Sequence, residues 1–129
     1  MGVRVDWYAG SDRVILMDFQ ENFSWDEFYG AKLEAEALIN TVEHTCALIL
    51  RFPARVPPLT NALSNGRSML SRRHSRAEQF IIVSESGFVR SLGMVLAQIA
   101  APRARLVEVT STLEGAETRL METGFLEAV

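Results

Sequence analysis

Arginine is concentrated in the middle of the chain, and it is the first residue type whose chemistry suggests a site. Residues 51–105 contain nine arginines and two glutamates, whereas residues 1–50 contain three basic and nine acidic side chains. Because a guanidinium group matches the geometry of phosphate and carboxylate groups, this basic region indicates a surface for an anionic ligand or an acidic partner. The net charge of the whole chain is −3, which argues against general binding of nucleic acid.

A loop and helix start within the basic region, LRFPARVPPLTNALSNGR at residues 50–67, carry hydroxyl groups close to arginines. A phosphate on one of these hydroxyls would bring about two negative charges to a helix start, next to positive side chains. The candidate phosphoacceptors are Thr60 and Ser64, and the candidate contacts for an anion or a partner are Arg51, Arg55 and Arg67.

Two further segments have both a functional and a structural interpretation. Ser86 and Gly87 precede an apolar helix whose free N–H groups would hold an anion, but Ser86 is also a preferred N-cap residue. Arg72 and Arg73 lie in GRSMLSRRHSR, residues 66–76, which would bind a phosphate, a lipid headgroup or an acidic partner. The alternative for these arginines is a solvated helix end whose positive charge complements the helix dipole.

Motifs of catalysis and of cofactor binding are missing from the sequence. His44, His74 and Cys46 are isolated from one another, so we expect no metal-binding cluster. No G-x-S-x-G nucleophile motif occurs, and the chain lacks a G-x-x-x-x-G-K-[ST] phosphate loop because its one lysine is Lys32. We therefore expect neither an enzyme nor a protein that holds a cofactor.

The elements that would position these residues follow from the spacing of apolar side chains. Residues 3–8 alternate in polarity, and residues 13–19 place apolar side chains on both faces of a second strand. Four residues join the two segments, which predicts an antiparallel hairpin. Ser24 and Glu27 form a capping box at the start of a helix that reaches residue 42. The apolar run TCALILRF, residues 45–52, is typical of a central strand that is buried on both faces.

The second half of the chain alternates helices with strands. We expect a helix to start at Pro57 or Pro58 and to run to residue 72, with Leu63 among its inward-facing residues. A strand at residues 79–85 and an apolar helix that ends at residue 101 follow. A strand at residues 104–110 and a helix with a capping box of Ser111 and Glu114 complete the chain.

The resulting element order is β-β-α-β-α-β-α-β-α. Strands that alternate with helices are joined by right-handed crossovers and lie parallel, and the first hairpin adds an antiparallel edge. We therefore predict a single α/β domain over residues 1–129, with a mixed, mostly parallel five-stranded sheet and helices on both faces. No apolar segment reaches the roughly 18 residues that span a bilayer, and Cys46 is the only cysteine, so we expect a cytoplasmic protein without a membrane span.

The element order and two phrases, VILMDFQENFSWDEFYGA at residues 14–31 and TSTLEGAETRL at residues 110–120, resemble the STAS-like superfamily. This is the fold of the anti-sigma-factor antagonists, with relatives similar to CRAL-TRIO lipid-binding domains, and the chain looks most like small bacterial proteins of that group. The antagonists carry a phosphoacceptor serine in an Asp-Ser-Ser-Gly-like motif after the central strand. Here that place falls near residues 57–60, where the motif is missing, Thr60 is the nearest hydroxyl and Ser64 is the next.

Two hypotheses for function result. The favoured one is a non-enzymatic, regulatory or protein-interaction module that binds a protein partner, or a second copy in a homodimer, through the loop after the central strand and the following helix. The alternative is a binder of a small molecule or lipid, with an apolar ligand against the 88–99 helix and an anionic group at Ser86 and Gly87 or at Arg51 and Arg55. Trp25, Phe28 and Tyr29 would either line such a pocket or belong to the core.

Overall fold

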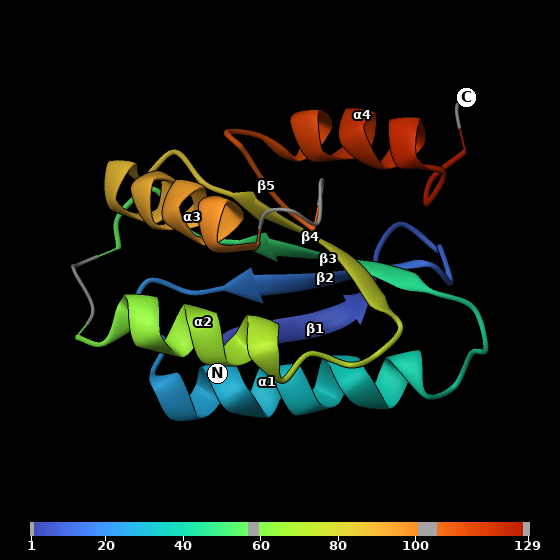
Figure 1. Cartoon of the computed structure of the whole chain (residues 1–129), viewed down its shortest axis with the longest axis horizontal. Helices are drawn as coiled ribbons and strands as arrows, with labels where there is room; N and C mark the ends of the chain where they lie inside the picture. Colours follow the sequence, from blue (N-terminus) through green and yellow to red (C-terminus); the bar gives the residue numbers. More distant parts are fainter. Residues whose placement is uncertain (1, 57–59, 101–105, 128–129) are drawn as a thin grey trace.

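One mixed β-sheet forms the centre of the protein in the computed structural model, which describes residues 2–56, 60–100 and 106–127 (Figure 1). Its strands are β1 (Val3–Trp7), β2 (Val14–Phe19), β3 (Cys46–Arg51), β4 (Ala77–Val83) and β5 (Val107–Thr110). They lie side by side in chain order; β1 is antiparallel to β2, and the other three pairs are parallel. The predicted α/β class, with a mixed and mostly parallel sheet, is confirmed.

Helices cover both faces of this sheet, as predicted. They are α1 (Trp25–Ile39), α2 (Ala62–Ser71), α3 (Gly87–Ala100) and α4 (Leu113–Thr123). Because α1, α2 and α3 each connect one parallel strand to the next in the same direction across the sheet, right-handed crossovers bring all three to one face. Figure 1 shows α4 apart from the other three helices, and its buried residues belong to a separate core on the opposite face.

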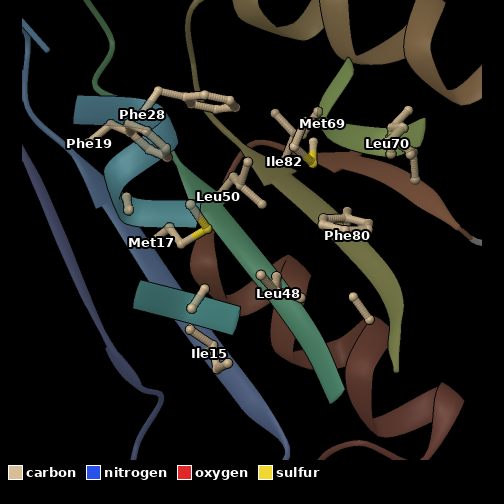
Figure 2. Packing of buried hydrophobic residues seen from close by; sticks show 14 of the residues in the cluster. Ile15, Met17, Phe19, Phe28, Leu48, Leu50, Met69, Leu70, Phe80 and Ile82 are labelled. Atoms are coloured by element: carbon tan, nitrogen blue, oxygen red, sulfur yellow. The ribbon is translucent and has the colours of Figure 1, made fainter. Parts of the chain in front are cut away.

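Both cores are built from alternate residues of the same strands. In β2, Ile15, Met17 and Phe19 face α1–α3, whereas Val14 belongs to the smaller core under α4. Figure 2 shows side chains of β2, β3 and β4 that meet in the larger core, among them Leu48 and Leu50 of β3. The central strand β3 is therefore buried on both faces, as its continuous apolar run predicts.

The helix α2 begins later than predicted. Pro57 and Pro58, where we expected its start, lie outside the described residues, but Thr60 and Asn61 form a turn and the helix begins at Ala62. Asn61 has a left-handed backbone (φ 61°), which interrupts any helix that approaches from the N-terminal side. The prediction that Leu63 faces inward is also wrong: its side chain is 39% exposed, because the buried face of α2 carries Ala62 instead.

The start of α4 differs from the prediction by one residue. The N-cap is Thr112, whose hydroxyl accepts a hydrogen bond from the Gly115 N–H at 3.1 Å, and not Ser111. With Thr112 as the cap, a glycine occupies the position where a capping box requires Glu or Gln, so Glu114 does not close one. The predicted strand before it corresponds to β5, and residues 104 and 105 of that prediction lie outside the described residues.

Two glycines allow α3 to pack closely against its neighbours. A Cβ atom on Gly66 of α2 would lie 2.8 Å from Leu96 Cδ1, and one on Gly93 of α3 would lie 2.7 Å from Val109 Cγ2. The Val109 side chain is β-branched and held in the sheet, so it cannot give way easily. This contact fixes the separation between α3 and the sheet.

We expect Gly93→Ala to lower the free energy of unfolding by about 1–3 kcal/mol, since overpacking outweighs the roughly 1 kcal/mol that alanine contributes to an isolated helix. Gly30→Ala in α1 is the matched control, because nothing lies within 4 Å of a Cβ atom there. The control should raise stability by up to about 1 kcal/mol. Urea denaturation of the three proteins measures both effects, and a stabilised Gly93→Ala variant would contradict the close packing.

Glu27 joins the first strand to the first helix. Its carboxylate accepts hydrogen bonds from the Ser24 N–H at 2.9 Å, which completes the predicted capping box, and from the Gly2 N–H at 2.6 Å. These two backbone hydrogen bonds, that from Ser24 first, lower the pKa of Glu27 below its ordinary value of 4.5. The ionised carboxylate therefore stabilises the fold above pH 4.5, and this contribution is lost as the pH falls through the lowered pKa.

Glu27→Gln should consequently lower the melting temperature at neutral pH, where the charged group is replaced by a neutral amide. At a pH well below the folded-state pKa of Glu27, both proteins carry a neutral side chain and the two melting temperatures should converge. Thermal unfolding followed by circular dichroism over a pH series measures the difference. A gap of constant size at every pH would show that the charge of Glu27 does not contribute.

Candidate functional site

Loops from three parallel strands meet at the carboxyl end of the sheet. They border a hollow of about 340 Å³, here called the strand-end hollow. It is lined by residues 51–54 at and after the end of β3, residues 83–85 at and after the end of β4 and residues 111–113 after β5. Its position is that expected for a ligand site in an α/β sheet. Arg51 is the one candidate contact from the sequence that lines it.

Two of the polar side chains that line the strand-end hollow, Ser84 and Thr112, have hydrogen-bond partners within the protein. The buried Ser84 hydroxyl donates to the Pro53 carbonyl at 3.3 Å and accepts from the Ser86 N–H at 3.0 Å. Thr112 uses its hydroxyl to cap α4. The Ser84 contacts tie the loop after β3 to the loop after β4, and Arg51, Glu85 and Ser111 also line the hollow.

Arg51 lies in a row of alternating charges across the sheet. Arg4, Asp18 and Arg51 are register partners on β1, β2 and β3, and their side chains share the α4 face of the sheet. Opposite charges at adjacent cross-strand positions attract one another, so Asp18 competes with any anion for Arg51. Glu85 in the strand-end hollow adds a further negative charge. Arg51 therefore has Asp18 as a cross-strand register partner and Glu85 in the same hollow, and the ion pairs within 4 Å among the described residues do not include it.

Tyr8 and Glu117 connect β1 to α4 on the same face. The Tyr8 hydroxyl donates to Glu117 Oε2 at 2.6 Å. Burial, followed by the hydrogen bond and the negative charge of Glu117, raises the pKa of Tyr8 to about 12, although Arg51 acts in the opposite direction. At neutral pH this phenol is therefore a protonated structural contact.

A second hollow, here called the α2–α3 groove, contains the other central candidates. It is open, has a volume of about 610 Å³, and is lined by residues 61–64 and Arg67 of α2 and its preceding turn and by Phe88 and Leu92 of α3. Ser64 and Arg67 are both exposed and lie three positions apart on one helix, so their side chains are neighbours. Thr60 is exposed in the turn before α2, and its carbonyl accepts from Trp25 Nε1 at 3.0 Å.

The remaining arginines do not join this groove. Arg55 is exposed in the loop after β3 and lines neither hollow. Arg73 donates to the Leu70 carbonyl at 2.8 Å, and the Arg72 carbonyl accepts from Lys32 Nζ at 3.0 Å, both at the C-terminal end of α2. Arg67 thus lies at the groove in the middle of α2, whereas Arg72 and Arg73 lie at the C-terminal end of the helix.

Ser86 and Gly87 lie at the start of α3. Ser86 is buried, and its hydroxyl accepts a hydrogen bond from the Val89 N–H at 3.3 Å. This is the geometry of an N-cap residue, the structural alternative to an anion site. Gly87 is exposed and is the first residue of α3. Neither residue lines the strand-end hollow or the α2–α3 groove.

An apolar cavity lies between α1, α2, α3 and the carboxyl ends of β3 and β4. Its volume is about 50 Å³, and every residue that lines it is apolar, including Trp25, Phe28 and Phe52. Both interpretations of Trp25 and Phe28 therefore apply, because these two side chains belong to the core and also border a cavity. Phe88 and Leu92 line both the cavity and the α2–α3 groove, so these side chains lie between the two.

Exposed apolar residues on α2 and α3 are the part of the site that sequence reasoning missed. Leu63, Met94, Val95 and Ile99 are 39–55% exposed. The signal available in the sequence was the near absence of charge from α3, where Arg90 is the one charged residue.

The described residues contain no group of three or more His, Cys, Asp or Glu side chains that could hold a metal ion. Among the helices in the described ranges, none is long and apolar enough to cross a membrane.

Comparison with models of protein families, with curated proteins and with solved structures gives no match. The STAS-like resemblance therefore stays a prediction.

Proposed function

We propose that the chain is a non-enzymatic, STAS-like interaction module that binds a protein through the α2–α3 groove and the loop after β3. The observation that carries the proposal is the composition of the groove, which places exposed Leu63 and half-buried Phe88 and Leu92 next to Arg67. Apolar and aromatic anchors beside an arginine are typical of the centre of protein interfaces. A partner with an apolar side chain and a nearby carboxylate would match this surface.

The chemistry of the groove favours binding over catalysis. Arg67 is the one ionisable side chain among the residues that line it, so the groove offers no pair of acid and base. The lack of a side chain on Gly66 lets Leu96 of α3 pack closely against α2 beside the groove. The proposed setting is the cytoplasm of a bacterium, where the buried Cys46 would stay reduced.

Ser64 is the candidate phosphoacceptor that this surface favours over Thr60. A phosphate on Ser64 would lie beside the Arg67 guanidinium and would change the charge of the groove by about two units. The binding surface itself does not require the modification, because its apolar anchors and Arg67 are present without it.

A small apolar ligand is the second candidate, and the cavity next to the groove is the observation that favours it. The cavity of about 50 Å³ is smaller than the roughly 150 Å³ that accommodates benzene in a protein core, so an acyl chain would require Phe88 and Leu92 to move. The polar part of such a ligand would then lie in the groove near Arg67.

Leu63→Glu and Arg67→Glu should each weaken partner binding about tenfold or more, because each would remove an anchor and place a negative charge in the groove. The measurement is capture of the partner by the tagged chain from its native cells, followed by titration of the identified partner. Leu33→Glu is the matched control, since Leu33 is 66% exposed on α1 and lies outside the groove. Equal binding by all four proteins would contradict the proposed surface.

Mass spectrometry of the chain purified from its native cells tests the ligand and the phosphate separately. A co-purified apolar molecule under native conditions would support the second candidate, and Leu92→Trp, which fills the space beside the cavity, should then abolish its retention. Intact mass and peptide mapping would locate a phosphate on Ser64 or Thr60. An unmodified chain without bound molecules would leave the interaction module as the function supported.

A further inference from the structure

Of the helices in the described ranges, α2 is the one that its own residues stabilise least. Its N-cap residue, Asn61, has a left-handed backbone and makes no side-chain cap hydrogen bond, whereas a Ser or Thr hydroxyl caps each of α1, α3 and α4. Half of its ten residues are of types that disfavour a helix, namely Ser64, Asn65, Gly66, Ser68 and Ser71. A helix this short is marginal in water, so α2 depends on contacts with its neighbours.

The contacts of α2 with α1 are mainly a row of hydrogen bonds. Three side chains of α1, spaced four and three residues apart and therefore on one side of the helix, donate to acceptors that span α2 from the turn before it to its C-cap. The hydrogen bonds are those from Trp25 Nε1 to the Thr60 carbonyl (3.0 Å), from the Tyr29 hydroxyl to Asn65 Oδ1 (2.6 Å) and from Lys32 Nζ to the Arg72 carbonyl (3.0 Å). The first and the last are exposed to solvent, so water can replace them at little cost.

The apolar packing beneath α2 is incomplete. Its buried residues are Ala62, Gly66, Met69 and Leu70, and two of these have little or no side chain. The first three form the α2 wall of the apolar cavity, and Met69 also lines a smaller hollow of about 20 Å³ that extends to Lys32 of α1. Atoms beside an empty space lack dispersion contacts on that side. Removal of α2 therefore sacrifices less packing than removal of a helix seated on a filled core.

We infer that α2 is a detachable cover of the apolar cavity: it leaves α1 and unfolds as one unit while the sheet, α1 and α3 stay folded. Few buried apolar contacts and exposed hydrogen bonds are the conditions for such local opening, and α2, which lies between α1 and α3 (Figure 1), meets both. Phe28 and Leu50, which line the cavity from α1 and β3, then meet solvent. The inference goes beyond the proposed function and does not depend on it.

Hydrogen exchange of the full chain, resolved by residue with NMR, tests the opening. The amides of residues 66–72, which donate within α2, should exchange at least about a hundredfold faster than those of the central strand β3, and all with similar protection. Tyr29→Phe removes one of the three hydrogen bonds to α2 and should speed exchange there about three- to tenfold.

Tyr8→Phe is the matched control for Tyr29→Phe. It removes a hydrogen bond of the same length, 2.6 Å, to Glu117 of α4 on the opposite face of the sheet. That hydrogen bond stays intact when α2 alone opens, so Tyr8→Phe should leave exchange in α2 unchanged. It should speed exchange only where the whole protein must unfold, as in β3.

Oxidation of Met69 by hydrogen peroxide tests whether the opening uncovers the cavity. Met69 is 6% exposed, so the reagent should reach its sulfur when α2 opens, and Tyr29→Phe should raise the initial rate of sulfoxide formation by the same factor as exchange in α2. Met94 on α3 is 55% exposed and is the internal reference, whose rate should not change. Peptide mapping by mass spectrometry measures both rates.

Three results would overturn the inference. Protection of α2 equal to that of β3, or faster exchange of α2 in Tyr8→Phe, would show that α2 opens only with the whole protein. Protection that rises from both ends of α2 to its middle would show fraying in place of a unit. An unchanged rate of Met69 oxidation in Tyr29→Phe would show that the cavity stays covered. A captured partner that depends on Leu63 and Arg67 would support the proposed function in each case.

Discussion

Burial of the central strand on both faces is the constraint on which the rest of the structure depends. Residues 46–50 of β3 are all at most 5% exposed, so each face of the sheet needs a covering layer. The three right-handed crossovers supply only one of these layers, because successive strands place their helices on the same side. The other layer is α4, whose Ala116 and Leu120 are fully buried against the middle of the sheet. Where α4 does not reach, charged residues such as Arg4 and Asp18 replace apolar ones on the same face.

The fold could be predicted because local signals and the global pattern agree. The alternation in β1, the apolar side chains of β2, the capping box of Ser24 and Glu27 and the apolar run of β3 each specify one element, and their order leaves few topologies. The errors occur where signals are weak or duplicated. Two adjacent hydroxyl residues precede α4, and the start of α2 is rich in Asn and Ser, which favour turns as readily as a helix.

The candidate site was harder to predict, because the number of charged residues in a segment does not say where each side chain lies in the fold. Arg67 and Arg73 are six positions apart in sequence, yet Arg67 lines the groove from the middle of α2 and Arg73 donates to the Leu70 carbonyl at the end of the helix. The exposure of apolar residues on α3 could not be predicted from composition either. A helix that contacts a partner has the same apolar composition as one that is buried in its own core, and Val95 and Ile99 differ from Leu96 only in their position around the helix.

The contact between Trp25 and the turn before α2 gives the protein an optical reporter at the surface of interest. The chain has two tryptophans, and the indole of Trp25 both borders the apolar cavity and donates its N–H to the Thr60 carbonyl. The emission of an indole depends on the polarity around it and on this hydrogen bond. Occupation of the groove, entry of a molecule into the cavity or displacement of the turn would therefore each change the intrinsic fluorescence, without any attached dye.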